Sequence, residues 1–266
     1  VLAFIDSDCL AAPDWLEKLD GYYADPKVCA VGGVIVIHNP VSVVEVHQAI
    51  REMWVGGAAP AVDPRNKNEL MIGNHLITNN CSYRRDLVEK AGGFDETFMV
   101  GEDIDLYLRF LDVLPPDGVV LPHRMDLIVR HEPRRTFRQY SWQQYSYRVA
   151  LARLIRKHFY KSIIISLPSV GVLARPNSFV TIWAPYQAST FTLVVLGCIV
   201  LYRYALFFLI PLFGYLLYEA SVGVKRTGLK VRARDLVALV ALSFSTRVVT
   251  KAGKMVGSWR YGVVCW

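Results

Sequence analysis

The chain has 266 residues, of which 53% are hydrophobic and 20% are charged, and its formal net charge is +7. Because the basic residues flank apolar segments instead of lining an aromatic-rich groove, this composition favours a membrane surface over nucleic acid as a partner. The five cysteines are scattered and lack CxxC spacing, which is typical of a reducing compartment and implies no zinc site.

The first half of the chain alternates short apolar runs with amphipathic segments, which predicts an α/β fold. Buried strands are expected over Val1–Ile5 and Val28–Ile37, with a helix over Pro13–Tyr23 between them. A further helix is expected over Val43–Val55. The segment Gly56–Asn68, which is rich in Gly, Ala, Pro and Asp, is expected to be a loop.

Three more elements complete this half. Leu70–Tyr83 is expected to include a strand, and Arg85–Ala91 is expected to be a short helix that ends at a pair of glycines. Asp103–Leu111 has helical spacing, with apolar residues on one side and Asp105 paired with Arg109 on the other side at i,i+4. The pattern therefore predicts a helix here with one buried and one polar face.

The composition changes near residues 160–176, so we expect a soluble domain over residues 1–160 and a membrane region over residues 161–266. Neither 176–202 nor 204–218 contains a charged residue, which predicts two membrane-spanning helices at about 181–201 and 204–224. Basic residues before the first span and after the second place both flanks, and the soluble domain, on the cytoplasmic side of the cell membrane. The segment at about 235–256 mixes apolar and basic residues and is expected to be an amphipathic interfacial helix.

Two carboxylates, Asp6 and Asp8, stand one residue apart directly after the first predicted strand. Such a pair can hold Mg²⁺ or Mn²⁺ and leave coordination positions open for phosphate oxygens. The alternative is an ordinary solvated turn in which Asp8 caps the backbone. The pair alone does not decide between these two interpretations.

Glu102 and Asp103 stand at the predicted start of a helix, where the helix dipole favours an ionised carboxylate. An ionised Asp103 is suited to act as a general base for a hydroxyl nucleophile, although acidic residues also occur at helix starts for their charge alone. His131 ends a short apolar run, and its imidazole can complete a Mn²⁺ site begun by Asp8. A lone histidine at a strand end is otherwise commonly a surface residue.

The order of these motifs is more specific than any one of them. The motifs are FIDSD, TNNCSYRRD, AGGFDETF, GEDIDLYLR and VRH. In this order the chain resembles the family-2 glycosyltransferases of GT-A fold over about residues 1–150. The resemblance implies the C-terminal part of a Rossmann-like GT-A domain. It also implies an enzyme that transfers a sugar from a nucleotide-sugar donor to a hydroxyl acceptor with inversion.

The resemblance also implies roles for single residues. Asp6 matches the acid that approaches the nucleotide ribose, and Asp8 matches the acid that holds Mg²⁺ or Mn²⁺ on the donor diphosphate. Asp103 matches the catalytic base, and Glu102, which directly precedes it, matches a substrate-binding residue. His131 matches a histidine that lies near the metal and the diphosphate.

Other positions are implied to contact the substrates. Asn79, Asn80 and Arg84 fall in the segment that lines the acceptor side in this family. Processive members carry a QxxRW motif, whereas here Gln144 and Arg148 lack its spacing and its Trp. This departure argues for transfer of a single sugar, and Arg148 is a candidate contact of the diphosphate.

In this family the nucleotide base is bound by βα units that precede the DxD motif, which here begins at residue 6. We therefore expect the chain to be the metal, catalytic and acceptor half of a longer polypeptide. The predicted function is sugar transfer at the cytoplasmic membrane face, to a lipid-linked or glycan acceptor. The alternative is a non-catalytic transferase half that acts as a membrane-bound interaction protein. A channel or transporter is disfavoured because the predicted spans contain few polar residues.

Overall fold

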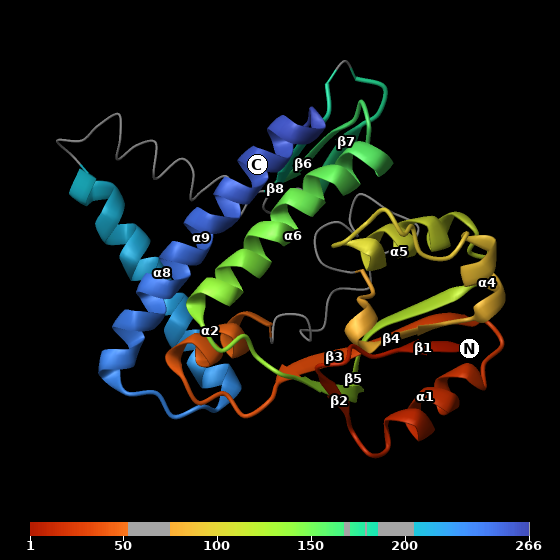
Figure 1. Ribbon diagram of the computed structural model, residues 1–266, viewed down its shortest axis with the longest axis horizontal. Helices are drawn as coiled ribbons and strands as arrows, with labels where there is room; N and C mark the ends of the chain where they lie inside the picture. Colours follow the sequence, from red (N-terminus) through yellow and green to blue (C-terminus); the bar gives the residue numbers. More distant parts are fainter. Residues whose placement is uncertain (53–74, 168–170, 179, 186–204, 266) are drawn as a thin grey trace. The chain divides into compact units, whose positions relative to one another are not determined.

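The structure is a computed structural model (Figure 1). It describes residues 1–52, 75–167, 171–178, 180–185 and 205–265. The chain divides into two compact units, the first made of Val1–Pro40 and Arg51–Pro133 and the second of Val41–Ile50 and Arg134–Trp266. The boundary expected at residue 160 thus differs from the packing, which groups the segment from Arg134 onward with the C-terminal elements.

A five-stranded mixed sheet forms the centre of the first unit, in the order β1-β4-β3-β5-β2. Its strands are β1 (Leu2–Phe4), β2 (Cys9–Ala11), β3 (Val28–Ile37), β4 (Cys81–Tyr83) and β5 (Val119–His131). The pair β3 and β5 is parallel, and the other neighbouring pairs are antiparallel. β3 is buried along almost its whole length, which explains its continuous apolar sequence.

Helices cover both faces of this sheet. On one face α1 (Trp15–Tyr23) buries Trp15 and Leu19 against β3 and β5. On the other face α4 (Arg85–Lys90) and α5 (Glu102–Asp112) bury an apolar cluster that includes Tyr83 and Phe110. The first unit is therefore a three-layer α/β/α arrangement, in agreement with the predicted fold class.

The predicted strands and helices of this unit are confirmed, with two corrections. β1 is a half-exposed edge strand and not a buried one, because among the described residues it pairs only with β4, and Val1 and Ile5 on either side of it are 57% and 37% exposed. Asp105 does not lie on a polar face: it is fully buried and pairs with Arg109 at 2.8 Å. Arg109 also donates to the carbonyl of Ala91, so this ion pair ties α5 to the segment that follows α4.

Three predicted segments extend beyond the described residues. Of Leu70–Tyr83, residues 70–74 lie outside the described part, and the strand expected within it is β4. The helix expected over Val43–Val55 is α2 (Val43–Glu52), and residues 53–55 lie outside the described part. The loop expected over Gly56–Asn68 lies wholly outside it.

The second unit contains most of α2 and three longer helices, α6 (Phe137–His158), α8 (Ala205–Thr227) and α9 (Ala233–Tyr261). A four-stranded sheet has the order β7-β6-β8-β9. Its strands are β6 (Ile163–Leu167), β7 (Gly171–Arg175), β8 (Ile182–Pro185) and β9 (Val264–Cys265). The capping box of Thr136 and Gln139 defines where α6 begins.

Helices α6 and α9 run side by side (Figure 1). They approach closely at two glycines of α9. A Cβ on Gly253 would lie 2.7 Å from the carbonyl oxygen of Tyr145, and one on Gly257 would lie 2.8 Å from the Cβ of Ala152. Glycine at these two positions therefore sets the distance between the two helices.

The start of the first predicted membrane span, at about 181–201, is not helical. Ile182–Pro185 is strand β8 and not the start of a helix, because it pairs in parallel with β6. Residues 186–204, which include Arg203, lie outside the described part. The second predicted span is helical, as α8, and Glu219 on it accepts from Arg247 of α9 at 2.9 Å.

One helix of the described residues, α9, is long and apolar enough to cross a membrane by length and composition. The core helix of a soluble protein passes the same test. A helix at about 235–256 is expected from the composition of this region, and the observed helix is longer at both ends.

Candidate active site

The two carboxylates of the DxD motif lie on the turn that joins β1 to β2. The turn is closed by a hydrogen bond of 3.0 Å from the backbone N–H of Cys9 to the carbonyl of Asp6. The backbone N–H of Glu132 donates to the carbonyl of Asp8 at 2.9 Å, which attaches the turn to the end of β5. These two hydrogen bonds together fix the backbone of the turn at Asp8.

The pairing of β2 with β5 brings His131 to Asp8. Cys9 stands opposite His131 in this antiparallel ladder. As a result Nε2 of His131 lies 3.5 Å from Oδ2 of Asp8. His131 is 6% exposed, so it is a buried residue and not a surface one.

This pair fits the divalent cation that the sequence predicts. A carboxylate and an imidazole that bind one ion at 2.0–2.1 Å lie about 3 Å apart when they are neighbours in its coordination sphere. The 3.5 Å observed between Asp8 and His131 requires only a small adjustment. An imidazole ligand suits Mn²⁺ better than Mg²⁺, which prefers oxygen.

The carboxyl group of Asp103 lies in the first turn of α5. Its Oδ1 accepts from the backbone N–H of Ile104 at 2.7 Å. Although the residue is partly exposed, burial of its carboxyl and, to a smaller extent, the charge of Glu102 raise the pKa to about 6. The expectation that the helix start sets this pKa is thus incomplete, because desolvation outweighs the backbone N–H groups. Asp103 is still mostly ionised at neutral pH.

Asp6 and Asp103 lie close to the same thiol. The pKa of Cys81 is raised well above its usual range by burial and then by the negative charges of Asp103 and Asp6. Cys81 begins β4 and pairs with Phe4 at the end of β1. A backbone N–H of Thr78, just before β4, in turn lowers the pKa of Asp103. The start of β4 therefore connects the DxD turn to Asp103 at the start of α5.

The predicted acceptor residues differ in their surroundings. Asn80 is 2% exposed, and its amide accepts from Trp15 Nε1 at 3.0 Å and donates to the carbonyls of Val34 and Leu127 at 2.8 and 2.9 Å. These contacts hold α1, β3 and β5 together. The Oδ1 atom of Asn79 is buried and makes no hydrogen bond within the described part of the chain.

Arg84 is also engaged with the chain itself. Its Nε donates to the carbonyl of Val28 at 2.8 Å, and its Nη2 donates to that of Asp25 at 3.2 Å. Its guanidinium lies over the ring of Tyr23, 5.4 Å from the centroid. These contacts anchor β4 to the start of β3, and a contact of Arg84 with an acceptor stays a prediction.

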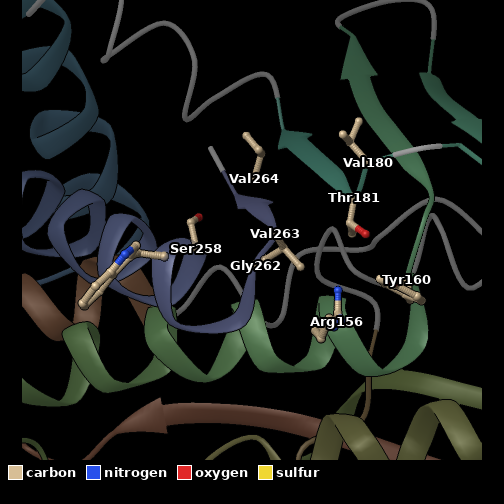
Figure 2. A pocket seen from close by; sticks show the side chains of 9 residues that line it. Arg156, Tyr160, Val180, Thr181, Ser258, Gly262, Val263 and Val264 are labelled. Atoms are coloured by element: carbon tan, nitrogen blue, oxygen red, sulfur yellow. The ribbon is translucent and has the colours of Figure 1, made fainter.

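Arg148 belongs to the second unit, on α6, where it lies beside Gly253 of α9. The same unit contains a pocket of about 420 Å³ near the ends of α6 and α9 (Figure 2). Arg156, whose guanidinium lies 3.9 Å from the ring centroid of Tyr160, is its one charged lining residue. None of the predicted site residues lines this pocket.

The model of the glycosyl transferase family group 2 matches residues 1–218. The chain belongs to this family. The match covers the whole of the first unit and extends into α8 of the second.

Curated relatives agree with this assignment. A pre-mycofactocin glycosyltransferase of Mycobacterium tuberculosis is 29% identical over 161 residues, which are 59% of this chain and 32% of the relative. A glucosyl-dolichyl phosphate glucuronosyltransferase of Haloferax volcanii is 35% identical over 99 residues, 36% of this chain and 29% of the relative. The O-antigen chain rhamnosyltransferase RfbN of Salmonella typhimurium is 25% identical over 146 residues, 53% of this chain and 45% of the relative. The matched region thus spans less than half the length of each relative.

The structure adds to the site one residue that was not predicted from the sequence. The thiol of Cys9 lies within 4.8 Å of the ligand atoms of Asp8 and His131. In the sequence, only the position of Cys9 directly after the DxD motif hints at a metal ligand. That position indicates a ligand once the pairing of β2 with β5 is known.

Proposed function

We propose that the chain carries the catalytic site of a metal-dependent, inverting glycosyltransferase of GT-A type. It moves a sugar from a nucleotide-sugar donor to a hydroxyl group of a lipid-linked or polysaccharide-precursor acceptor. The reaction takes place at the cytoplasmic face of the cell membrane.

The observation that carries this proposal is the environment of Asp103. A carboxylate whose pKa is raised to about 6 is a stronger base than an ordinary aspartate and is still mostly ionised at neutral pH. In the proposed reaction Asp103 removes the proton from the acceptor hydroxyl as its oxygen attacks the anomeric carbon. The attack is opposite to the leaving diphosphate, so the anomeric configuration inverts.

Asp8 and His131 are the residues that would hold the divalent cation, which when bound supplies positive charge for the leaving diphosphate. Asp6, on the same turn, would contact the ribose of the donor. Glu102, beside the base, and Asn79, whose side-chain oxygen is buried and makes no hydrogen bond within the described part, are available to the acceptor.

The acceptor class is inferred from two observations. The Haloferax volcanii relative is named for action on a dolichyl phosphate lipid, and the Salmonella typhimurium relative is named for the O-antigen chain. In the chain itself, α8 and α9 expose large apolar side chains, and these include Ile210, Tyr218, Val237 and Met255. Exposed apolar surface on two long helices favours a membrane as their surroundings.

The proposal is tested by donor binding and by turnover. We expect the purified chain to bind a UDP- or GDP-sugar in the presence of Mn²⁺ in calorimetry, and Asp8→Asn to weaken this binding at least tenfold. Asp20→Asn, which changes an exposed carboxylate on α1, is the matched control and is expected to bind like the wild type. Product formed from an α-linked donor is expected to be β-linked by NMR.

The second candidate, a non-catalytic half that binds membrane or partners, predicts a different result. In that case neither a donor nor Mn²⁺ binds, and Asp8→Asn changes nothing. Retention of the anomeric configuration in the product would contradict the inverting mechanism while leaving the transferase assignment intact.

A further inference from the structure

Cys9 lies at the predicted metal site but has no part in the proposed reaction. Its thiol, the carboxylate of Asp8 and the imidazole of His131 lie within 4.8 Å of one another. Cys9 is half-buried, and its sulfur is in no disulfide. Because Cys9 is paired with His131 across β2 and β5, both side chains leave the same face of the sheet.

We propose that Cys9 is a third protein ligand, so that this centre binds a thiophilic divalent cation of the zinc class more tightly than Mn²⁺ or Mg²⁺. The inference rests on the metal site of the proposed function and adds to it a ligand and a class of cation. The absence of CxxC spacing implied no zinc site, but here the three donors come from two strands that meet only in the folded sheet.

The spacing of the donors suits a tetrahedral ion. Nitrogen and oxygen ligands at about 2.0–2.1 Å and a sulfur ligand at about 2.3 Å lie roughly 3.3–3.6 Å from one another around tetrahedral zinc. The 3.5 Å between Asp8 and His131 falls in this range. The Cys9 sulfur lies within 4.8 Å of both other ligand atoms, and rotation about its χ1 angle can bring it closer to them.

The ligand types select the same class of cation. A thiolate is a soft ligand that favours zinc over manganese and magnesium, and the general order of affinities places zinc above manganese. Three protein ligands leave a fourth position open for a phosphate oxygen or water. The Cys9 thiol loses its proton to solvent as the cation binds, so that a sulfur–zinc bond replaces the sulfur–hydrogen bond.

The charge balance predicts what zinc does to the enzyme. The carboxylate of Asp8 and the thiolate of Cys9 together cancel both positive charges of the ion, whereas Asp8 and His131 alone leave one. A centre without net positive charge attracts the donor diphosphate less. Zinc is therefore expected to displace Mn²⁺ and to inhibit sugar transfer.

Packing offers a simpler role for Cys9, because it also contacts the apolar cluster of Trp15 and Leu19. The two roles differ in what the sulfur does. A packing role needs only a small side chain, and a ligand role needs a thiolate.

The test is a titration of the whole purified chain with Co²⁺, which reports its ligands by absorption. The wild type is expected to show the near-ultraviolet charge-transfer band of a cobalt–thiolate bond. Cys9→Ser is expected to lose this band and to bind Co²⁺ and Zn²⁺ at least roughly tenfold more weakly, with a much smaller change for Mn²⁺. Cys29→Ala removes a buried thiol elsewhere in the sheet and is expected to keep the band.

A second measurement needs no substitution and so does not depend on the stability of a variant. Zn²⁺ is expected to protect Cys9 of the wild type from alkylation, as followed by mass spectrometry. If Co²⁺ binds without a charge-transfer band and Cys9 stays reactive, the inference is wrong while the site of Asp8 and His131 stands. If neither Co²⁺ nor Mn²⁺ binds, the metal site of the proposed function fails as well.

Discussion

Oδ2 of Asp8 and Nε2 of His131 lie 3.5 Å apart because β2 and β5 pair in the register that sets Cys9 opposite His131. The backbone N–H of Ala12 donates to the carbonyl of Ile128 at 3.0 Å and continues this pairing beyond the strand. The DxD turn and the end of β5 therefore form one rigid corner of the first unit. A site built on paired strands holds its ligands more accurately than one built on a free loop.

Asp103→Asn is expected to lower the turnover number on the order of 10²–10⁴-fold, because the amide cannot accept the proton of the acceptor hydroxyl. The amide oxygen can still accept from the N–H of Ile104, so the start of α5 is expected to keep its structure. Steady-state kinetics measures the turnover number, and circular dichroism shows whether the helical structure is kept. Asp112→Asn, an exposed residue at the end of the same helix, is the control and is expected to keep wild-type turnover. Near-normal turnover in Asp103→Asn would show that another group is the base.

The pH dependence of stability gives an independent test of the environment of Asp103. Its pKa is raised from 3.8 to about 6 in the folded state, so the wild type loses stability as the pH rises through this range and the carboxyl ionises. At about 1.4 kcal/mol per pKa unit the effect is at most roughly 3 kcal/mol. Asp103→Asn does not titrate, and we expect it to be more stable than the wild type above pH 6.

This difference in the free energy of unfolding is expected to shrink toward zero below about pH 3, where the wild-type carboxyl is protonated in both states. Urea unfolding at a series of pH values in a chelating buffer measures it without bound cation. A difference that is constant with pH would show that the carboxyl of Asp103 is not desolvated.

Asn80→Ala is expected to destabilise the first unit by about 3 kcal/mol or more. The change leaves the indole N–H of Trp15 and the carbonyls of Val34 and Leu127 buried without their partner, at about 1–3 kcal/mol each. Thermal unfolding followed by tryptophan fluorescence measures the loss.

Asn79→Ala is the matched control for this experiment, because the side-chain oxygen of Asn79 makes no hydrogen bond within the described residues. Its stability is expected to stay within about 1 kcal/mol of the wild type. If Asn80→Ala folds normally and only the KM for the acceptor rises, then Asn80 acts on the substrate and not on the sheet.

Gly257→Ala is expected to weaken the packing of α9 on α6 by about 1–3 kcal/mol, since the new Cβ would lie 2.8 Å from that of Ala152. Gly214→Ala in α8 is the control: no atom of the described residues lies within 4 Å of its new Cβ, and alanine gains up to about 1 kcal/mol of helix stability. Denaturant unfolding followed by circular dichroism compares the two. Equal stability of both variants would argue against close packing at Gly257.

The local pattern of residues predicts much of the first unit. The continuous apolar run Val28–Ile37 predicts β3 with its observed bounds, and the spacing of apolar residues after Gly101 predicts α5. The order of the acidic and histidine motifs along the chain also indicates the family. These features are local or depend on order along the chain, so they are visible in a sequence without knowledge of its contacts.

Other features depend on contacts between residues that are distant in sequence. The sheet order makes β1 an edge strand, and the packing of α5 buries Asp105 with Arg109. Asn80 links three elements, and the desolvation that raises the pKa of Asp103 exists only in the folded chain. Strand register and burial arise from contacts between distant segments. The order of residues therefore indicates which side chains are candidates for the chemistry, and the fold sets their distances and proton affinities.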